Sequence, residues 1–257
     1  MRGTVSAEWT KLTTLPGTIW LLLAVVSATA ALGAGADAAT TCPSGSCAVD
    51  PARVCLTGIY LGQAIVVVFA AAVISGEYST GMIRVTFSAM PRRTAVLAAK
   101  AAVVTGMVLA AGAVAVLGSV LAGRLILPGH GFSPAHGYPA LSLADGPVLR
   151  AAAGSVLYLA LIALLSLGVA AAVRDTALAV GTVLGLLYVV PIISAVLGNS
   201  HLARHLQQIA PMTAGLAIQS TTGLRSLPLS PWAGLGVLAA WAAATFLAGG
   251  LRLHLRD

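Results

Sequence analysis

Charged residues are scarce in this chain. Only 8% of its 257 residues are Asp, Glu, Lys or Arg, and Lys11 and Lys100 are its two lysines. A soluble domain carries about 25% charged residues, because its surface faces water. With 58% hydrophobic residues and a mean hydropathy of +0.96, the composition excludes a soluble globular protein.

Several motifs of enzymes and nucleotide-binding proteins are also missing. The sequence has no HExxH zinc motif, no GxSxG nucleophile elbow and no GxxxxGK[ST] phosphate-binding loop. His201 and His205 are one helical turn apart, but no nearby Asp, Glu or Cys would complete a metal site. The basic residues behind the net charge of +7 are scattered, so we expect no nucleic-acid partner. We expect no catalytic residue, metal or cofactor in this chain.

Six uncharged runs are long enough to cross a bilayer core of about 30 Å, which takes about 20 helical residues. The predicted spans are 17–36, 54–76, 101–123, 151–173, 176–198 and 231–251. The remaining loops are too short for a second core. Residues 1–257 are therefore predicted to be one all-α integral membrane domain with six transmembrane helices and no charged residue inside any span.

The basic residues predict the orientation. With an even number of spans, nine of the 14 Lys and Arg fall on the side of the termini: Arg2, Lys11, Arg84, Arg92, Arg93, Lys100, Arg174, Arg252 and Arg256. The positive-inside rule then places both termini in the cytoplasm, in a multi-pass cytoplasmic membrane protein. The first apolar run is longer than the core of a signal peptide, so we expect it to be retained.

The three cysteines fit this orientation. Cys42 and Cys47 fall in a short polar loop on the side predicted to be oxidising, where a disulfide between them is plausible. Cys55 begins the second span and is most simply an unpaired, small hydrophobic residue. Three cysteines leave the pairing undetermined by sequence alone.

The first dozen residues are predicted to form a short amphipathic helix in the membrane interface. Val5, Trp9 and Leu12 have helical spacing, with Glu8 and Lys11 on the other side. The alternative is a frayed, charged leader, because short helices are marginal unless they are docked.

The loop between spans two and three has a second candidate helix. Ser79 or Thr80 can cap its start, and Pro91 ends a helical run from Met82 to Met90. Apolar side chains surround this run instead of forming one stripe. A helix of this kind outside the membrane needs a partner to cover it.

Three later features leave alternatives open. Gln63, with Tyr60 one turn earlier, is predicted either to make a helix-to-helix hydrogen bond, which we favour, or to line a pathway. The run His201 to Ala210 is either an interfacial helix or a re-entrant hairpin. Gly181 and Gly185 form a GxxxG motif that permits close helix contact, although in a chain so rich in Ala it is weak evidence for an interface.

Six spans, the leader Glu8-Trp9-Thr10-Lys11-Leu12 and the loop Gly76-Glu77-Tyr78-Ser79-Thr80-Gly81, followed by Pro91-Arg92-Arg93, resemble a type-2 ABC exporter permease. The composition resembles that of actinobacterial members. The resemblance implies a transport subunit, not an enzyme, which forms a dimer with the same or a homologous permease. Separate P-loop ATPase subunits would bind ATP and Mg. Rival functions are a channel that needs no ATP, and a sensory or structural membrane partner of an ATPase.

The resemblance also implies roles for individual residues. A short cytoplasmic coupling helix would contact the ATPase. The residues that would couple the permease to the ATPase are Glu77, Tyr78, Gly81, Met82, Ile83, Arg84, Phe87, Met90 and Arg92. The connecting helix contains Val5, Glu8, Trp9, Lys11 and Leu12, and His201 to Ala210 corresponds to an external helix. The uncharged spans favour an apolar or amphipathic substrate, such as a drug, lipid or natural product, so the expected role includes multidrug efflux.

Overall fold

Six long apolar helices dominate the structure, a computed structural model that describes residues 2–42, 47, 49–79, 93–133, 138, 141–196 and 201–255. The six that could cross a membrane are Pro16–Ala39, Pro51–Gly76, Ala95–His130, Gly146–Val173, Thr176–Ser194 and Pro231–Arg252. Five predicted spans fall inside these bounds, and the remaining one, 176–198, continues into residues outside the described ranges. The prediction of a helical protein with six candidate spans is therefore confirmed.

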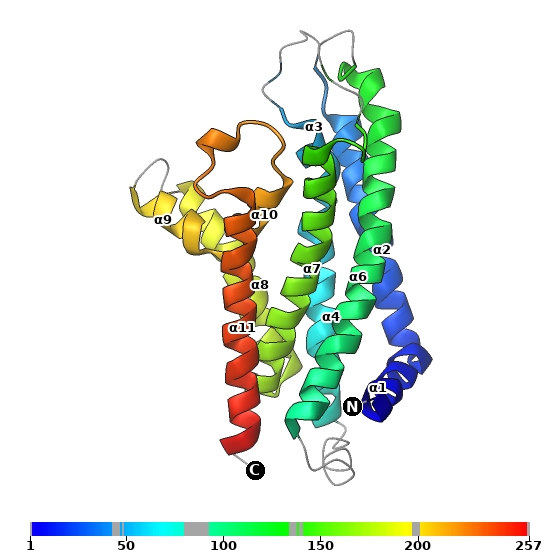
Figure 1. The fold of residues 1–257 in the computed structure, drawn as a ribbon, viewed down its shortest axis with the longest axis vertical. Helices are drawn as coiled ribbons and strands as arrows, with labels where there is room; N and C mark the ends of the chain where they lie inside the picture. Colours follow the sequence, from blue (N-terminus) through cyan, green and yellow to red (C-terminus); the bar gives the residue numbers. More distant parts are fainter. Residues whose placement is uncertain are drawn as a thin grey trace.

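The elements follow one another with short links (Figure 1). The α-helices are α1 (Arg2–Thr14), α2 (Pro16–Ala39), α3 (Pro51–Cys55), α4 (Ile59–Ser79), α6 (Arg93–Ile126), α7 (Gly146–Val173), α8 (Thr176–Val196), α9 (His201–Ile209), α10 (Pro211–Leu216) and α11 (Pro231–Leu255). Short 3-10 turns are η1 (Leu56–Gly58), η2 (Leu127–His130), η4 (Ala217–Gln219) and η5 (Leu224–Ser226). The turn η1 continues into α4, so Pro51–Gly76 is one nearly continuous helical segment.

Proline and one left-handed residue set several helix boundaries. The prolines in first turns are Pro16, Pro51, Pro147, Pro211 and Pro231. Proline suits a first turn because its missing N–H would have no partner there. Arg174 ends α7 with a φ of 66°, and the Asp175 carboxylate accepts a hydrogen bond from the Leu178 N–H at 2.8 Å to begin α8. Two residues therefore reverse the chain between α7 and α8.

Helix α7 is at the centre of the bundle, in contact with α4, α6, α8 and α11. Its fully buried side chains include Tyr158, Leu159 and Ile162. The outer helices expose large apolar side chains, such as Trp20 of α2 at 72% and Val196 of α8 at 83%. Such surfaces suit lipid or another membrane helix. The start of α1 and the end of α11 lie at the same end of the bundle, as an even number of spans requires (Figure 1).

Two helices extend past the uncharged runs that were predicted as spans and contain buried charged residues. Asp37 lies within α2 and Lys100 within α6, and both side chains are buried. Both helices extend past their uncharged cores, because a single charge does not end a helix. Asp37 lies close to the Cys55 thiol: a Cβ added at Gly123 would contact both side chains. The buried charges lie within about two turns of a helix end and not at mid-span.

The close helix contact occurs at a different GxxxG motif from the one singled out in the sequence. Gly181 and Gly185 have no atom within 4 Å of the position where a Cβ would lie. Gly58 and Gly62 are also spaced GxxxG, and a Cβ at either would overlap Thr29 of α2. These two glycines therefore allow the backbone of η1 and α4 to approach α2.

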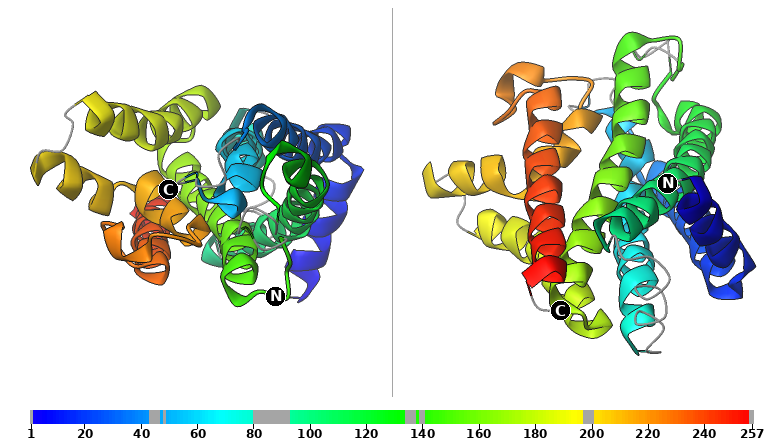
Figure 2. Two further views of the ribbon diagram at one scale, coloured as in Figure 1. Left: turned by 90° about the horizontal axis from the view of Figure 1, so that it is seen from above. Right: turned by 60° about the horizontal axis from the view of Figure 1, so that its bottom comes forward.

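The segment before α11 contains two short helices that differ in burial. Helix α9 is mostly exposed, including its apolar residues Leu202 and Ile209. Helix α10 follows directly and is largely buried, with Met212 in the core. The Trp241 indole N–H of α11 donates to the Ile209 carbonyl at 3.0 Å. The chain therefore runs along the surface of the bundle in α9 and enters it in α10, beside α11 (Figure 2).

Candidate functional site

A buried ion pair joins α1 to α6 at the end of the bundle where both termini lie (Figure 1). Lys100 Nζ is 2.7 Å from Glu8 Oε2, and the two side chains are 3% and 9% exposed. Removing an ion from water costs several kcal/mol, so each charge needs the other in this position. The pair therefore fixes α1 against the bundle in one position and one rotation about its axis.

The prediction that Glu8 lies on the side of α1 opposite Leu12 is wrong. Glu8 is buried, as is Leu12 one turn later, whereas Val5 and Trp9 are 37% and 52% exposed. The spacing within α1 grouped Leu12 with Val5 and Trp9, but Leu12 is buried with Glu8. It also carried no information about Lys100 on another helix. The exposed Trp9 suits the boundary between headgroups and hydrocarbon, where Trp is enriched.

Most residues assigned to ATPase coupling lie outside the described residues: Gly81, Met82, Ile83, Arg84, Phe87, Met90 and Arg92. Glu77 and Tyr78 lie in the last turn of α4, which continues past Gly76 to Ser79. They therefore belong to α4, just past the candidate span that ends at Gly76. The end of α4 and the start of α6, which flank residues 80–92, lie at the same end of the bundle as α1 (Figure 1).

Gln63 is fully buried and makes hydrogen bonds between helices. Its Oε1 accepts from the Tyr158 hydroxyl of α7, and its Nε2 donates to Met212 Sδ of α10 at 3.4 Å. The Tyr188 hydroxyl of α8 donates to the backbone carbonyl of Tyr60. This is the helix-to-helix role that the sequence favoured for Gln63. Four helices meet at this polar cluster.

Replacing Tyr158 with Phe is expected to lower the free energy of unfolding by about 1–2 kcal/mol, because the Gln63 carbonyl loses its donor in a buried place. The measurement is thermal unfolding of the purified chain in detergent. Tyr60→Phe is the control: Tyr60 takes part through its backbone carbonyl, which the substitution keeps. Equal melting of the two variants would contradict the assignment.

A disulfide and a tyrosine connect two loops at the end of the bundle opposite the termini. Cys42 and Cys47 form the disulfide, and Cys55 is free and buried. The Tyr138 hydroxyl donates to the Cys47 carbonyl at 2.6 Å and accepts from the Cys47 N–H at 2.9 Å. The Tyr138 ring packs edge-on against Phe132, with 5.1 Å between centroids. The loop after α2 is thereby attached to the loop after η2.

Asp50 joins the start of α3 to the segment before α11, which the sequence did not reveal. Its carboxylate accepts from the Thr221 N–H at 2.5 Å, the Thr221 hydroxyl at 2.7 Å and the Thr222 N–H at 3.1 Å. Arg150 of α7 donates to the neighbouring Ser220 carbonyl at 2.6 Å. Hydrogen bonds to charged groups are stronger than neutral ones. This end of the bundle is therefore fastened by a covalent bond and several hydrogen bonds.

Comparison with known proteins does not assign the chain to a family. No family model matches the chain, and no curated protein matches it. What the chain does is therefore argued from its residues and their geometry.

Proposed function

We propose that this chain is the membrane-spanning permease subunit of an ATP-driven exporter in the cytoplasmic membrane. Two permeases, identical or homologous, form the dimer, and separate P-loop ATPase subunits bind ATP and Mg at the end that contains the termini. The observation that carries the proposal is the buried pair of Glu8 and Lys100, which joins α1 to α6 near the start of α6.

Through this ion pair, a force on residues 80–92 would displace three helices together: α6, α1 and α2. Helix α6 begins at Arg93, directly after this segment, and Lys100 lies seven residues later, about 10 Å along the axis. A displacement of the start of α6 moves Lys100 and, through Glu8, moves α1. Leu15 alone links α1 to α2, so the displacement continues into the first spanning helix. Rigid helix movements of this kind are a common basis of switching between two packings.

The distribution of charge supports an apolar or amphipathic substrate. The buried charges in the spanning helices, Asp37 and Lys100, lie near helix ends. Deeper in the bundle, the buried polar side chains that the structure describes are neutral, as in the cluster around Gln63. An ion at the bilayer centre would need charged or strongly polar partners. A drug, a lipid or a secreted natural product therefore suits the spans better than an ion.

The test is affinity purification of the tagged chain from membranes of its native host, followed by mass spectrometry. We expect a stoichiometric P-loop ATPase with the wild-type chain and its loss when Glu77 and Phe87 are both replaced with Ala. In vesicles, this double variant should abolish substrate-stimulated ATP hydrolysis while the permease dimer stays intact.

A matched control changes the opposite end of the bundle. Leu224 and Arg225 are exposed in η5, and their double replacement with Ala should leave the ATPase bound. Recovery of the chain without any ATPase would contradict the proposal and favour a channel or a structural partner. Retention of the ATPase by the Glu77 and Phe87 double variant would remove the coupling assignment.

A further inference from the structure

Helix α2 ends at the side of the bundle opposite the termini (Figure 1), and Asp37 in its last turn is fully buried. Neither oxygen of the Asp37 carboxyl has a hydrogen-bond partner among the described residues. A Cβ added at Gly123 of α6 would lie 3.1 Å from the Asp37 oxygen Oδ2 and would overlap the sulfur of Cys55 in α3. The Asp37 carboxyl is therefore enclosed between α3 and α6, beside a buried thiol.

Within the described part of the chain, no side chain beside this end of α2 forms a hydrogen bond with Asp37. The titratable groups on the adjoining parts of α3, α6 and η2 are Asp50, Arg53, Cys55, Arg124 and His130. Both arginines are exposed, and the Asp50 carboxylate and the His130 ring make hydrogen bonds elsewhere, to the segment before α11 and to the end of α6. The Cys55 thiol is only a weak donor. An isolated carboxylate loses its hydration without compensation when it is buried, so the acid takes up a proton instead.

Helix α2 is packed closely from its middle to this end. At Thr29, two turns before Asp37, the backbones of α2 and η1 touch, since a Cβ added at Gly58 would overlap the Thr29 carbonyl. One turn before Asp37, a Cβ added at Gly33 would overlap the carbonyl oxygen of Cys55. Because these contacts are so close, water reaches the Asp37 carboxyl only when the end of α2 moves away from α3 and α6.

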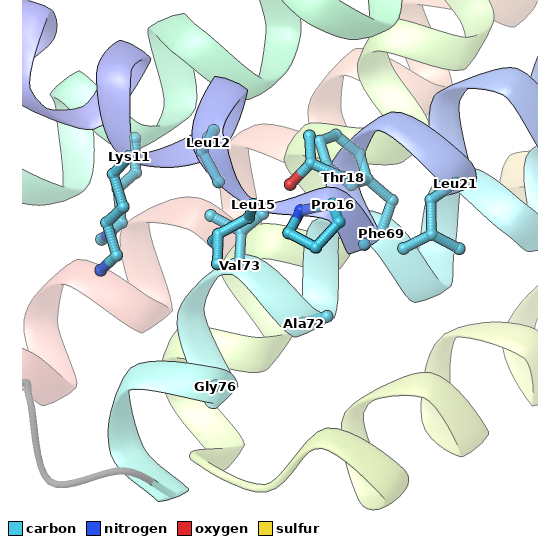
Figure 3. A pocket seen from close by; sticks show the side chains of 12 residues that line it. Lys11, Leu12, Leu15, Pro16, Thr18, Leu21, Phe69, Ala72, Val73 and Gly76 are labelled. Carbon is cyan, nitrogen blue, oxygen red and sulfur yellow. The ribbon is translucent and has the colours of Figure 1, made fainter.

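The first turns of α2 are packed less closely. An apolar pocket of about 430 Å³ lies between the start of α2 and α4. Pro16 and Leu21 of α2 and Val73 of α4 are among the residues that line it (Figure 3). Helix α2 therefore has a close contact at Thr29 and free space beside its first turns. A tilt about Thr29 that moves the end of α2 outward would carry its first turns into this pocket.

We propose that Asp37 binds a proton in this packing, and that release of the proton to water tilts α2 about Thr29. The protonated carboxyl is neutral and is tolerated between α3 and α6. The deprotonated carboxyl favours a packing in which water reaches it, so the end of α2 separates from Cys55 and its first turns enter the pocket. Leu15 alone links α2 to α1, so the tilt also moves α1 at the opposite end of the bundle.

The test measures how fast N-ethylmaleimide labels Cys55 in the full chain in detergent, followed by intact-protein mass spectrometry. Cys42 and Cys47 form the disulfide, so the label reports on Cys55, which is free and fully buried. Every thiol reacts faster as the pH rises, so each rate is divided by the rate of Asp37→Asn, which stays neutral, at the same pH. We expect this ratio to increase about tenfold between about pH 5.5 and about pH 8.

Three further variants make the result specific. Ala72→Phe places a ring in the pocket, so Cys55 should be labelled as slowly as in Asp37→Asn at both pH values. Val68→Phe puts the same ring on the same helix at a residue that is 37% exposed and does not line the pocket, so it should behave like the wild type. Asp145→Asn removes an exposed carboxyl and should also behave like the wild type.

Equal labelling of the wild type and Asp37→Asn at about pH 8, or wild-type labelling in a folded Ala72→Phe variant, would overturn the proposal. If one of these two variants does not fold, the other still serves as the slowly labelled reference. The labelling involves no ATPase and no transport. Its failure would therefore leave the permease function standing, and a failed ATPase purification would leave the proton site standing.

Discussion

Replacement of Glu8 with Ala is expected to destabilise the folded chain by about 3–5 kcal/mol. The variant leaves the Lys100 ammonium buried, at 3% exposure, without the carboxylate 2.7 Å away. Removing one partner of a buried pair has this large effect because the remaining charge keeps its desolvation penalty and loses the attraction. The measurement is thermal unfolding in detergent, followed by size-exclusion chromatography.

Two controls separate the charge from the side-chain volume. Glu8→Leu combined with Lys100→Met removes both charges. Its free energy of unfolding is expected to lie within about 1 kcal/mol of the wild-type value. Thr10→Ala changes an exposed residue of α1, whose hydroxyl donates only within the helix, so it should have an effect of about 0.5 kcal/mol or less. If Glu8→Ala melted like Thr10→Ala, the ion pair would not fix α1.

Replacement of Gly58 with Ala is expected to destabilise the chain by about 3 kcal/mol, at the upper end of the range for overpacked cores. The new Cβ would overlap the backbone carbonyl oxygen of Thr29, which cannot rotate out of the way. Helix α2 would have to move away from η1 and α4, and the contact at Gly62 would loosen with it. Thermal unfolding in detergent measures the loss.

The matched control uses the other GxxxG motif. Gly181→Ala meets no atom within 4 Å, and Ala is favoured over Gly in a helix by about 0.5–1 kcal/mol. This variant should melt at or above the wild-type temperature. A similar loss of stability in both variants would contradict the role of the crossing at Thr29, because helix propensity favours Ala at both positions and only Gly58 lies against Thr29.

The spanning helices could be predicted because they depend on local chemistry. The length of an apolar run and a proline in the first turn are both visible within a single segment, as at Pro16 and Pro231. The same local view placed span limits at charges, which is why Asp37 and Lys100 were left outside helices that contain them. A helix continues as long as its backbone hydrogen bonds can form.

The contacts that make the candidate site could not be predicted in this way. Glu8 and Lys100 are 92 positions apart, and Gln63 and Met212 are 149 apart. Spacing within α1 shows which side chains share a face, but not which charge another helix presents to that face. The two GxxxG motifs make the same point, because only the position of Thr29 distinguishes them.

The carboxylate of Asp50 has a consequence for the order in which the chain is made. Its partners Thr221 and Thr222 follow 171 and 172 positions later. At about 5–20 residues per second, the ribosome synthesises Asp50 roughly 10–35 s before Thr221 exists. During that interval the helices up to α8 have to keep their arrangement without this link. Translation of the last 40 residues therefore does more than add α11. It also supplies Thr221 and Thr222, the hydrogen-bond partners that Asp50 lacks until then.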